Sequence, residues 1–267
     1  MTEPFNIEDA EGQDITDLEQ QENQPMLKII QSGSAEIKAS HKDYEKKKIE
    51  GAVEGDIVFG KDATIIGQPI EAIFVGQSSL VKAEWKPKDA GGGLVGHHSL
   101  AVANHPQYSR KRNDRDTAFN EFLGANQLKD TIYGYLLFKR EVEGEIIWEK
   151  AIIAFSGTGL SCIKDYNKML RNTDLNYEAA DGTKIKPKFI FCHRVKISTF
   201  ANNNTSGDWM GWKIDHDGLL DLTADEALLS QGQEAGRACK ADLPKLANVE
   251  SYALTDSAAA TAEDEPF

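Results

Sequence analysis

The sequence has few cysteines, no long hydrophobic run and no positive charge in its first segment. Its three cysteines, Cys162, Cys192 and Cys239, are odd in number and widely spaced, which favours reduced thiols in a cytoplasm over a disulfide framework. The longest apolar runs, such as Ala151 to Phe155, contain only a few residues, whereas a membrane-spanning helix needs about 20. We therefore expect a cytoplasmic protein without a membrane segment.

Positive charge is missing from residues 1–25, which contain eight Asp/Glu and no Lys/Arg. This excludes the basic start of a signal peptide. With few large apolar side chains, the segment cannot bury enough surface to offset the entropy of ordering, so we expect a disordered acidic arm.

The net charge of -13 hides a mildly basic body between two acidic ends. Residues 215–267 contain twelve Asp/Glu and three Lys/Arg, while residues 26–214 contain 27 Lys/Arg and 23 Asp/Glu, a net charge of +4. A nucleic-acid partner is therefore compatible with the body, although the average charge suggests otherwise.

The body shows mainly β-type patterns. The clearest is a hairpin, in which Thr131 to Val142 and Glu145 to Phe155 are rich in aromatic and β-branched residues and meet at Glu143-Gly144. A second hairpin is predicted from Pro187 to Phe200 and Trp209 to Ile214, joined by a turn at 202–207. Shorter strands are expected at Ile57 to Phe59, Ile70 to Val75 and Leu80 to Trp85.

Helical spacing occurs at three places. Asp114 or Asp116 could begin a short helix that ends before Gly124, and a longer helix is predicted from about Leu160 to Leu170. The sequence Thr223-Ala224-Asp225-Glu226 has the pattern of a capping box that opens a third helix. We therefore divide the chain into a body at 26–215, a helical extension at 216–249 and a disordered acidic tail at 250–267.

The chain ends in Glu263-Asp264-Glu265-Pro266-Phe267, three carboxylates followed by proline and a terminal aromatic residue. A hydrophobic pocket with a basic rim would hold the ring and the terminal carboxylate together, and the acids would steer the approach. This ending resembles that of bacterial single-stranded DNA-binding proteins, and of their bacteriophage counterparts with an acidic tail and a terminal Phe. The body does not show the bacterial core sequence, so the bacteriophage proteins are the closer comparison.

The resemblance implies a protein without enzymatic activity or cofactor that coats single-stranded DNA in replication, recombination and repair. It implies the cytoplasm of a phage-infected bacterium as the location, and replication or recombination proteins as partners of Glu263, Asp264, Glu265, Pro266 and Phe267. Deleting Phe267 is then expected to abolish recruitment and spare DNA binding. If the acidic end has no such role, the deletion would change nothing.

Candidate DNA contacts combine basic side chains for phosphates with aromatic side chains on which any base can stack. The best single candidate is the loop from Tyr108 to Arg112, which has few apolar reasons to be buried. In the late strand, period two places Arg194 and Lys196 on the face opposite Val195. The full set is Trp85, Tyr108, Arg110, Lys111, Arg112, Arg115, Lys139, Arg140, Trp148, Lys150, Lys186, Lys188, Arg194, Lys196, Trp209 and Trp212.

The expected fold class is α+β, mainly β, with an OB-fold-like barrel, long loops and peripheral helices. An OB-fold is inferred from the predicted function, because this small barrel binds single strands through extended loops. The glycine run Gly91 to Gly93 would lie in one such loop.

Other interpretations remain open. Zinc binding by His97, His98 and His105 would need a further ligand, and no Cys-x-x-Cys pair exists. A metal-dependent nuclease could use Asp215 and Asp217 beside His216, although such residues at the start of an acidic region more commonly form a solvated turn. An acidic interaction module that mimics DNA would bind a partner's basic site and ignore oligonucleotides.

Overall fold

The computed structural model describes residues 25–87, 94–98, 124–179, 181–204 and 207–242. Four predicted features lie outside these residues: nearly all of the N-terminal arm, the loop that contains Gly91 to Gly93 and Tyr108 to Arg112 together with Arg115, the short helix before Gly124, and the C-terminal tail.

The central hairpin is formed by β7 (Gln127–Val142) and β8 (Glu145–Ser156), which pair from Val142 opposite Glu145 to Thr131 opposite Ser156. Its two turn residues both have positive φ, 54° at Glu143 and 87° at Gly144. That conformation matches the type I′ turn, whose twist suits a hairpin. The predicted hairpin and its turn are confirmed.

Strand β7 also pairs along its other edge with two strands that follow each other in the chain. β4 (Ile70–Gln77) pairs with the later half of β7 and β5 (Val81–Trp85) with its beginning. Both are antiparallel to β7, so β4 and β5 run end to end in one direction. β6 (Leu94–His98) then extends the sheet beyond β5.

The second predicted hairpin is also present, as β11 (His193–Asn204) and β12 (Gly207–Leu219). β11 pairs with β4, giving the order β12, β11, β4, β7, with β8 on the far side of β7. The prediction that a strand begins at Pro187 is wrong, because Ile190–Cys192 form a 3₁₀ turn, η2, before β11.

The described strands do not close into a barrel: β6, β8 and β12 are edge strands, and β8 does not pair with β12. The N-terminal segment bridges the gap between them. The amide of Ile152 in β8 donates to the carbonyl of Pro25 at 3.1 Å. The side-chain amide of Gln31 donates to the carbonyl of Met210 in β12 at 2.9 Å and accepts from its N–H at 2.8 Å. Gln31 therefore satisfies the backbone C=O and N–H of Met210 on the edge of β12, which in a closed barrel would pair with another strand.

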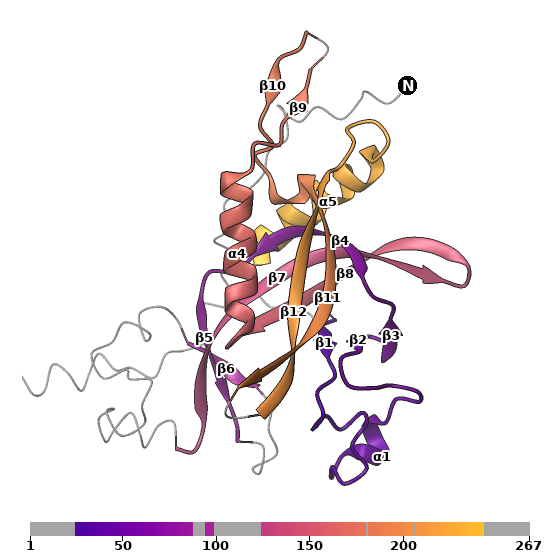
Figure 1. Ribbon diagram of the computed structural model, residues 1–267, viewed down its shortest axis with the longest axis vertical. Helices are drawn as coiled ribbons and strands as arrows, with labels where there is room; N and C mark the ends of the chain where they lie inside the picture. The colour runs from indigo at the N-terminus through magenta and orange to yellow at the C-terminus, as the bar shows by residue number, and fades with distance from the viewer. Residues whose placement is uncertain (1–24, 88–93, 99–123, 180, 205–206, 243–267) are drawn as a thin grey trace, which may run out of the picture.

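This segment contains β1 (Leu27–Ile29), which forms a small sheet with β2 (Ile57–Phe59) and β3 (Thr64–Ile66). The short helix α1 (Tyr44–Lys47) lies in the loop between β1 and β2. In Figure 1 this indigo lobe lies below the sheet, near the start of β12.

The helix predicted near Leu160 to Leu170 is confirmed as α4 (Gly159–Asn172), which buries Ile163 and Tyr166. It lies alongside β12 (Figure 1) and also contacts β8. Asn167 and Gln77 exchange two hydrogen bonds of 2.8 and 2.9 Å between their side-chain amides, which fixes the helix against the end of β4.

Helix α5 (Glu226–Asp242) packs on β4 and η2. The prediction of a capping box at Thr223 is wrong, because the cap lies two residues earlier. A carboxylate oxygen of Asp221 accepts hydrogen bonds from the N–H groups of Thr223 at 2.8 Å and Ala224 at 2.7 Å. A two-stranded hairpin, β9 (Tyr177–Glu178) and β10 (Lys184–Ile185), projects at the top of Figure 1.

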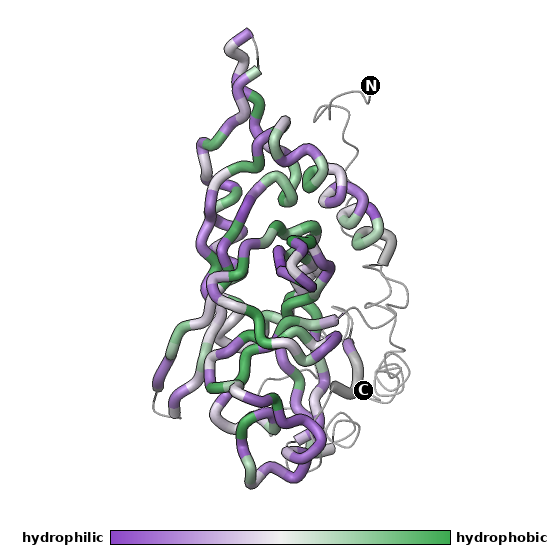
Figure 2. The backbone as a smooth tube through the Cα atoms, turned by 90° about the vertical axis from the view of Figure 1, so that its right-hand side faces the viewer, coloured by the Kyte–Doolittle hydropathy of each residue, from purple (hydrophilic) through white to green (hydrophobic). Residues whose placement is uncertain are grey.

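Two hydrophobic clusters lie on opposite faces of the sheet. In β4, Phe74 belongs to the cluster beneath α4, and its neighbour Ile73 belongs to the cluster beneath α5, because successive strand residues point to opposite faces. Gly134 of β7 is needed for space, since a Cβ there would lie 2.7 Å from the Phe74 ring. Figure 2 shows the most hydrophobic backbone in the middle of the molecule.

Candidate nucleic-acid interface

A cleft of about 460 Å³ lies at the gap between β8 and β12. It is bordered by the N-terminal segment, the ends of β7 and β8 that lie beside β5, the first residues of α4 and the start of β12. The side chains most relevant to binding are Met26, Lys28, Gln31, Lys129, Ser156, Thr158, Trp209 and Trp212.

Two connections end beside this cleft, a long one between β6 and β7 and a two-residue one between β11 and β12. Lys129 lies two residues into β7, directly after the connection from β6, and that connection contains the predicted Tyr108 to Arg112 loop. Trp209 lies two residues into β12, just after the turn from β11. Because both residues line the same cleft, the structure places the bases of the two connections next to each other.

The structure distinguishes the two tryptophans of β12, which the sequence could not separate. Trp209 is half-buried, and its indole N–H donates to the hydroxyl of Thr158 at 3.1 Å. Trp212 is only 8% exposed, and its ring centroid lies 6.4 Å from that of Phe155 in an edge-to-face arrangement. Trp209 is therefore held at the surface of the cleft, while Trp212 belongs to the core and forms the cleft's inner wall.

Trp85 is half-buried at the end of β5, and the ammonium nitrogen of Lys129 lies 5.9 Å from the centroid of its ring. Such a cation–π contact orients the lysine without neutralising it. Lys129 was not among the predicted contacts, yet it is exposed and lines the cleft.

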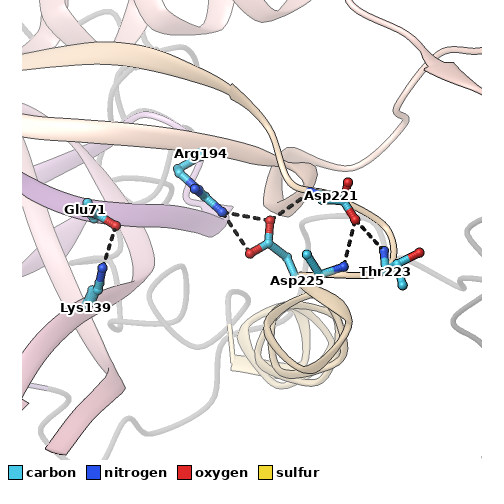
Figure 3. Close-up of polar contacts among 7 residues, drawn as sticks. Glu71, Lys139, Arg194, Asp221, Thr223 and Asp225 are labelled. Carbon is cyan, nitrogen blue, oxygen red and sulfur yellow. Dashed lines mark hydrogen bonds and ion pairs between the residues drawn. The ribbon is translucent and has the colours of Figure 1, made fainter.

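Three predicted contacts besides Arg140 have carboxylate partners within the protein. Arg194 makes two contacts with Asp225 at 2.7 and 2.8 Å, and Lys139 lies 3.1 Å from Glu71 (Figure 3). Lys196 lies 2.9 Å from Asp217. The prediction that Arg194 and Lys196 lie on the face of the strand opposite Val195 is confirmed, since Val195 is buried and the other two are not. Each of the two cations, however, forms an ion pair with a carboxylate.

Arg140 takes part in packing between two sheets. Its guanidinium contacts Asp62 at 2.7 Å and Glu149 at 3.2 Å and lies 5.1 Å from the centroid of the Phe59 ring, and its side chain is 11% exposed. This environment fixes the β2–β3 segment on the central hairpin. The arginine therefore has a structural role that the sequence did not reveal.

The remaining described candidates are not brought together with the cleft residues. Trp148 is half-buried against the second core cluster, and Lys150 is exposed on β8. Lys186 and Lys188 are exposed after β10, which lies at the end of the molecule opposite the start of β12 (Figure 1).

A group of lysines near the cleft was missed. Lys38, Lys42, Lys46 and Lys47 are exposed in the α1 lobe, the loop of residues 31–55 between β1 and β2. The base of the lobe is fixed beside β12 by the Gln31–Met210 hydrogen bonds. The signal that could have identified it is the run Lys46-Lys47-Lys48 beside Tyr44.

A buried histidine, His193, and a half-buried one, His216, form a pair on the β11–β12 hairpin. Nδ1 of His193 lies 3.0 Å from Nε2 of His216. Burial and the neighbouring His216 lower the pKa of His193 to about 4, and burial lowers the pKa of His216 as well. Both rings are therefore neutral at pH 7, one donating and one accepting the shared hydrogen bond.

The described residues contain no cluster of three or more His, Cys, Asp or Glu side chains arranged to hold a metal ion. Asp215 and Asp217, considered as metal ligands, lie 2.6 Å from Lys213 and 2.9 Å from Lys196 respectively. Of the zinc candidates, His97 hydrogen-bonds to the Tyr133 hydroxyl at 2.7 Å, and His105 lies outside the described residues.

Comparison with known proteins gives one match. The sequence matches the Pam3 phage gp34-like protein family over residues 3–242. No curated protein and no solved structure matches. Within the described part of the chain, no helix is both long enough and apolar enough to cross a membrane. Because the match covers most of the sequence, the chain belongs to the Pam3 phage gp34-like protein family, a family of bacteriophage proteins.

Proposed function

We propose that this protein binds single-stranded DNA without sequence preference in bacteriophage DNA replication, recombination and repair. The observation that carries the proposal is the cleft between β8 and β12, which places the indole of Trp209 and the ammonium group of Lys129 at the bases of two connections. An aromatic face binds any unpaired base by stacking, and a lysine neutralises the adjacent phosphate.

The strand connectivity supports this proposal. An OB-fold is a five-stranded, partly open Greek-key barrel that binds oligonucleotides. The combined β4–β5 strand pairs with β7 and β11, and α4 joins β8 to β11. The pairing that would complete the barrel, between β8 and β12, is replaced by the bridge of Pro25 and Gln31.

The charge distribution near the cleft also supports it. Lys129 is exposed beside the Trp85 ring, and the α1 lobe adds Lys38, Lys42, Lys46 and Lys47. Lys129 provides a cation at the cleft itself, and the lobe lysines lie on a loop whose first residue, Gln31, also lines the cleft. In this proposal, four of the predicted contacts stabilise the fold, because each forms an ion pair with a carboxylate: Arg194, Lys196, Lys139 and Arg140.

The acidic ending Glu263 to Phe267 has a separate role in the proposal. It recruits replication or recombination proteins and does not contact the DNA, since its carboxylates repel phosphates. The protein itself catalyses no reaction and requires no cofactor.

Fluorescence anisotropy with labelled single-stranded, double-stranded and RNA probes tests the proposal at about 50 mM and about 200 mM salt. We expect preferential binding to single-stranded DNA that weakens at the higher salt concentration. Trp209→Ala should reduce affinity by about 1–3 kcal/mol, the value of one stacked base. Lys129→Gln should lower the slope of log affinity against log salt by about 0.7, the value for one phosphate contact.

Lys168→Gln is the matched control, because Lys168 is exposed on α4 and does not line the cleft. Its affinity and salt slope should equal those of the unmodified protein. The proposal is wrong if the unmodified protein does not bind single strands, or if the cleft variants bind as tightly as the control.

A further inference from the structure

Phe200 of β11 is a large hydrophobic residue with 42% of its surface exposed. It lies directly opposite Gly211 of β12. Side chains opposite each other in an antiparallel pair lie on the same face. The Phe200 ring is thus presented on the outer face of the hairpin, together with Trp209, which is opposite Asn202.

Gly211 makes room for this ring. A Cβ on Gly211 would lie 3.1 Å from Cε1 and 3.4 Å from Cζ of Phe200, and 2.6 Å from the side-chain nitrogen of Asn202. The backbone of Gly211 does not have positive φ, so glycine is not needed there for its conformation. It is needed because the Phe200 ring lies over it, with one side on the strand and the other side open.

The open side borders a cavity of about 390 Å³ between the hairpin and α4. Its lining combines the apolar side chains of Phe200, Trp212 and Met169 with polar side chains that include Asn202, Lys213 and His216. Aromatic side chains beside polar groups suit a planar molecule with hydrogen-bonding edges, and the volume lies at the lower end of the range for small-molecule sites.

This cavity adjoins the cleft described above. Both are lined by Thr158, Gly159, Gly211 and Trp212, and Trp209, which lines the cleft, donates its indole N–H to the hydroxyl of Thr158, which lines both. Trp209 and Phe200 are diagonal neighbours across the hairpin, a spacing of about 7–8 Å between their backbones. A strand that stacks a base on Trp209 therefore has Phe200 within reach of a neighbouring nucleotide.

We propose that Phe200 is a second stacking platform, which receives an unpaired nucleobase in the cavity between the β11–β12 hairpin and α4. This inference rests on the proposed DNA-binding function and extends it to a named subsite. Gly211 is its positioning residue, because it lets the ring lie against the strand. The four lining residues shared with the cleft favour a nucleobase over a protein side chain as the occupant, because a strand bound in the cleft passes beside this cavity.

The test compares Phe200→Ala, Phe200→Tyr and Gly211→Ala with the unmodified full-length chain. Anisotropy gives the affinity for single-stranded DNA, and an oligonucleotide containing 2-aminopurine reports stacking through quenching of its emission. Phe200→Ala should weaken binding by about 5- to 100-fold, as for one stacked base, and reduce quenching. Phe200→Tyr should retain both. Gly211→Ala should weaken binding by displacing the ring, with circular dichroism showing the β-structure retained.

Ile146→Ala is the control, because Ile146 is 64% exposed on the central hairpin and lines neither opening. Its affinity should not change. Phe200→Ala could match the unmodified protein in affinity for single-stranded DNA and in quenching of 2-aminopurine, while Trp209→Ala binds weakly. In that case the assignment of Phe200 as a stacking platform is wrong and the proposed function stands. If the unmodified protein binds no single-stranded DNA, both are wrong. Loss of self-association in Phe200→Ala at unchanged DNA affinity would assign the ring to a protein interface and also overturn the platform.

Discussion

Two residues of the same type can differ in their ability to bind a phosphate, because neighbouring side chains set their environment. Lys129 and Lys196 are both lysines on strands, but Lys129 lies exposed beside the Trp85 ring and Lys196 lies 2.9 Å from Asp217. A lysine beside a carboxylate attracts a phosphate less strongly, because the carboxylate repels the phosphate and offsets the attraction of the ammonium group. The two lysines are therefore expected to affect DNA binding differently.

Arg194→Met is expected to lower the free energy of unfolding by about 1–3 kcal/mol, since the substitution removes two charge-assisted hydrogen bonds to Asp225. Affinity for single-stranded DNA should not change. Urea denaturation measures the stability, with Lys188→Met as a control that replaces an exposed cation. A large loss of DNA affinity in Arg194→Met, with unchanged stability, would return this arginine to the DNA interface.

The His193–His216 pair predicts a dependence of stability on pH. The folded protein keeps His193 neutral down to pH of about 4, whereas the unfolded chain takes up a proton at its usual pKa of about 6.5. The unfolded state therefore binds more protons between these values. Stability should fall as the pH decreases from 7 to 4, by on the order of 3 kcal/mol from this residue, and this contribution should level off below pH 4.

Urea denaturation of the unmodified protein and of His193→Gln at pH 7, 5.5 and 4 isolates this effect from the titration of carboxylates. The stability difference between the two proteins should shrink as the pH falls. Parallel curves over the whole range would show that His193 does not titrate differently in the two states.

At the scale of elements, local sequence determined the features that depend on few residues. Glu143-Gly144 between two β-type runs predicted the central hairpin, and the 3.6-residue spacing of Leu160, Ile163 and Tyr166 predicted α4. Both were found. The extended pattern after Pro187 failed because η2 turns the chain there and packs Phe191 and Cys192 into the core beneath α5, a long-range contact that overrides strand propensity.

The turn of the central hairpin offers a test at this scale. Glu143 has a φ of 54°, which is unfavourable for most residues and tolerated by asparagine. Glu143→Asn should therefore stabilise the protein by up to about 1 kcal/mol, and Gly144→Ala should destabilise it by about 1 kcal/mol because φ is 87° there. Thermal unfolding measures both. The turn assignment is contradicted if the two substitutions shift the midpoint in the same direction.

At the scale of the whole molecule, the two acidic ends and the basic body act on each other through charge. Residues 250–267 contain five carboxylates, three of them consecutive, and under the proposed function these compete with a DNA backbone for the same cations. Removing them is expected to tighten binding to single-stranded DNA at low salt, with a smaller gain at high salt, because screening weakens the competition. Anisotropy at the two salt concentrations measures the difference, and unchanged or weaker binding at low salt would contradict it.

The sequence by itself determined the mainly β character, the two hairpins, helix α4 and the separation of charge along the chain, because each depends on residues close in sequence. It did not determine that Gln31 bridges to Met210, that Asp225 neutralises Arg194, or that Gly211 lets the Phe200 ring lie exposed. These contacts join residues far apart in the chain, and the choice among many possible partners is made only when the sheet fixes their positions. The tertiary structure therefore decided which of the many basic and aromatic residues line the cleft.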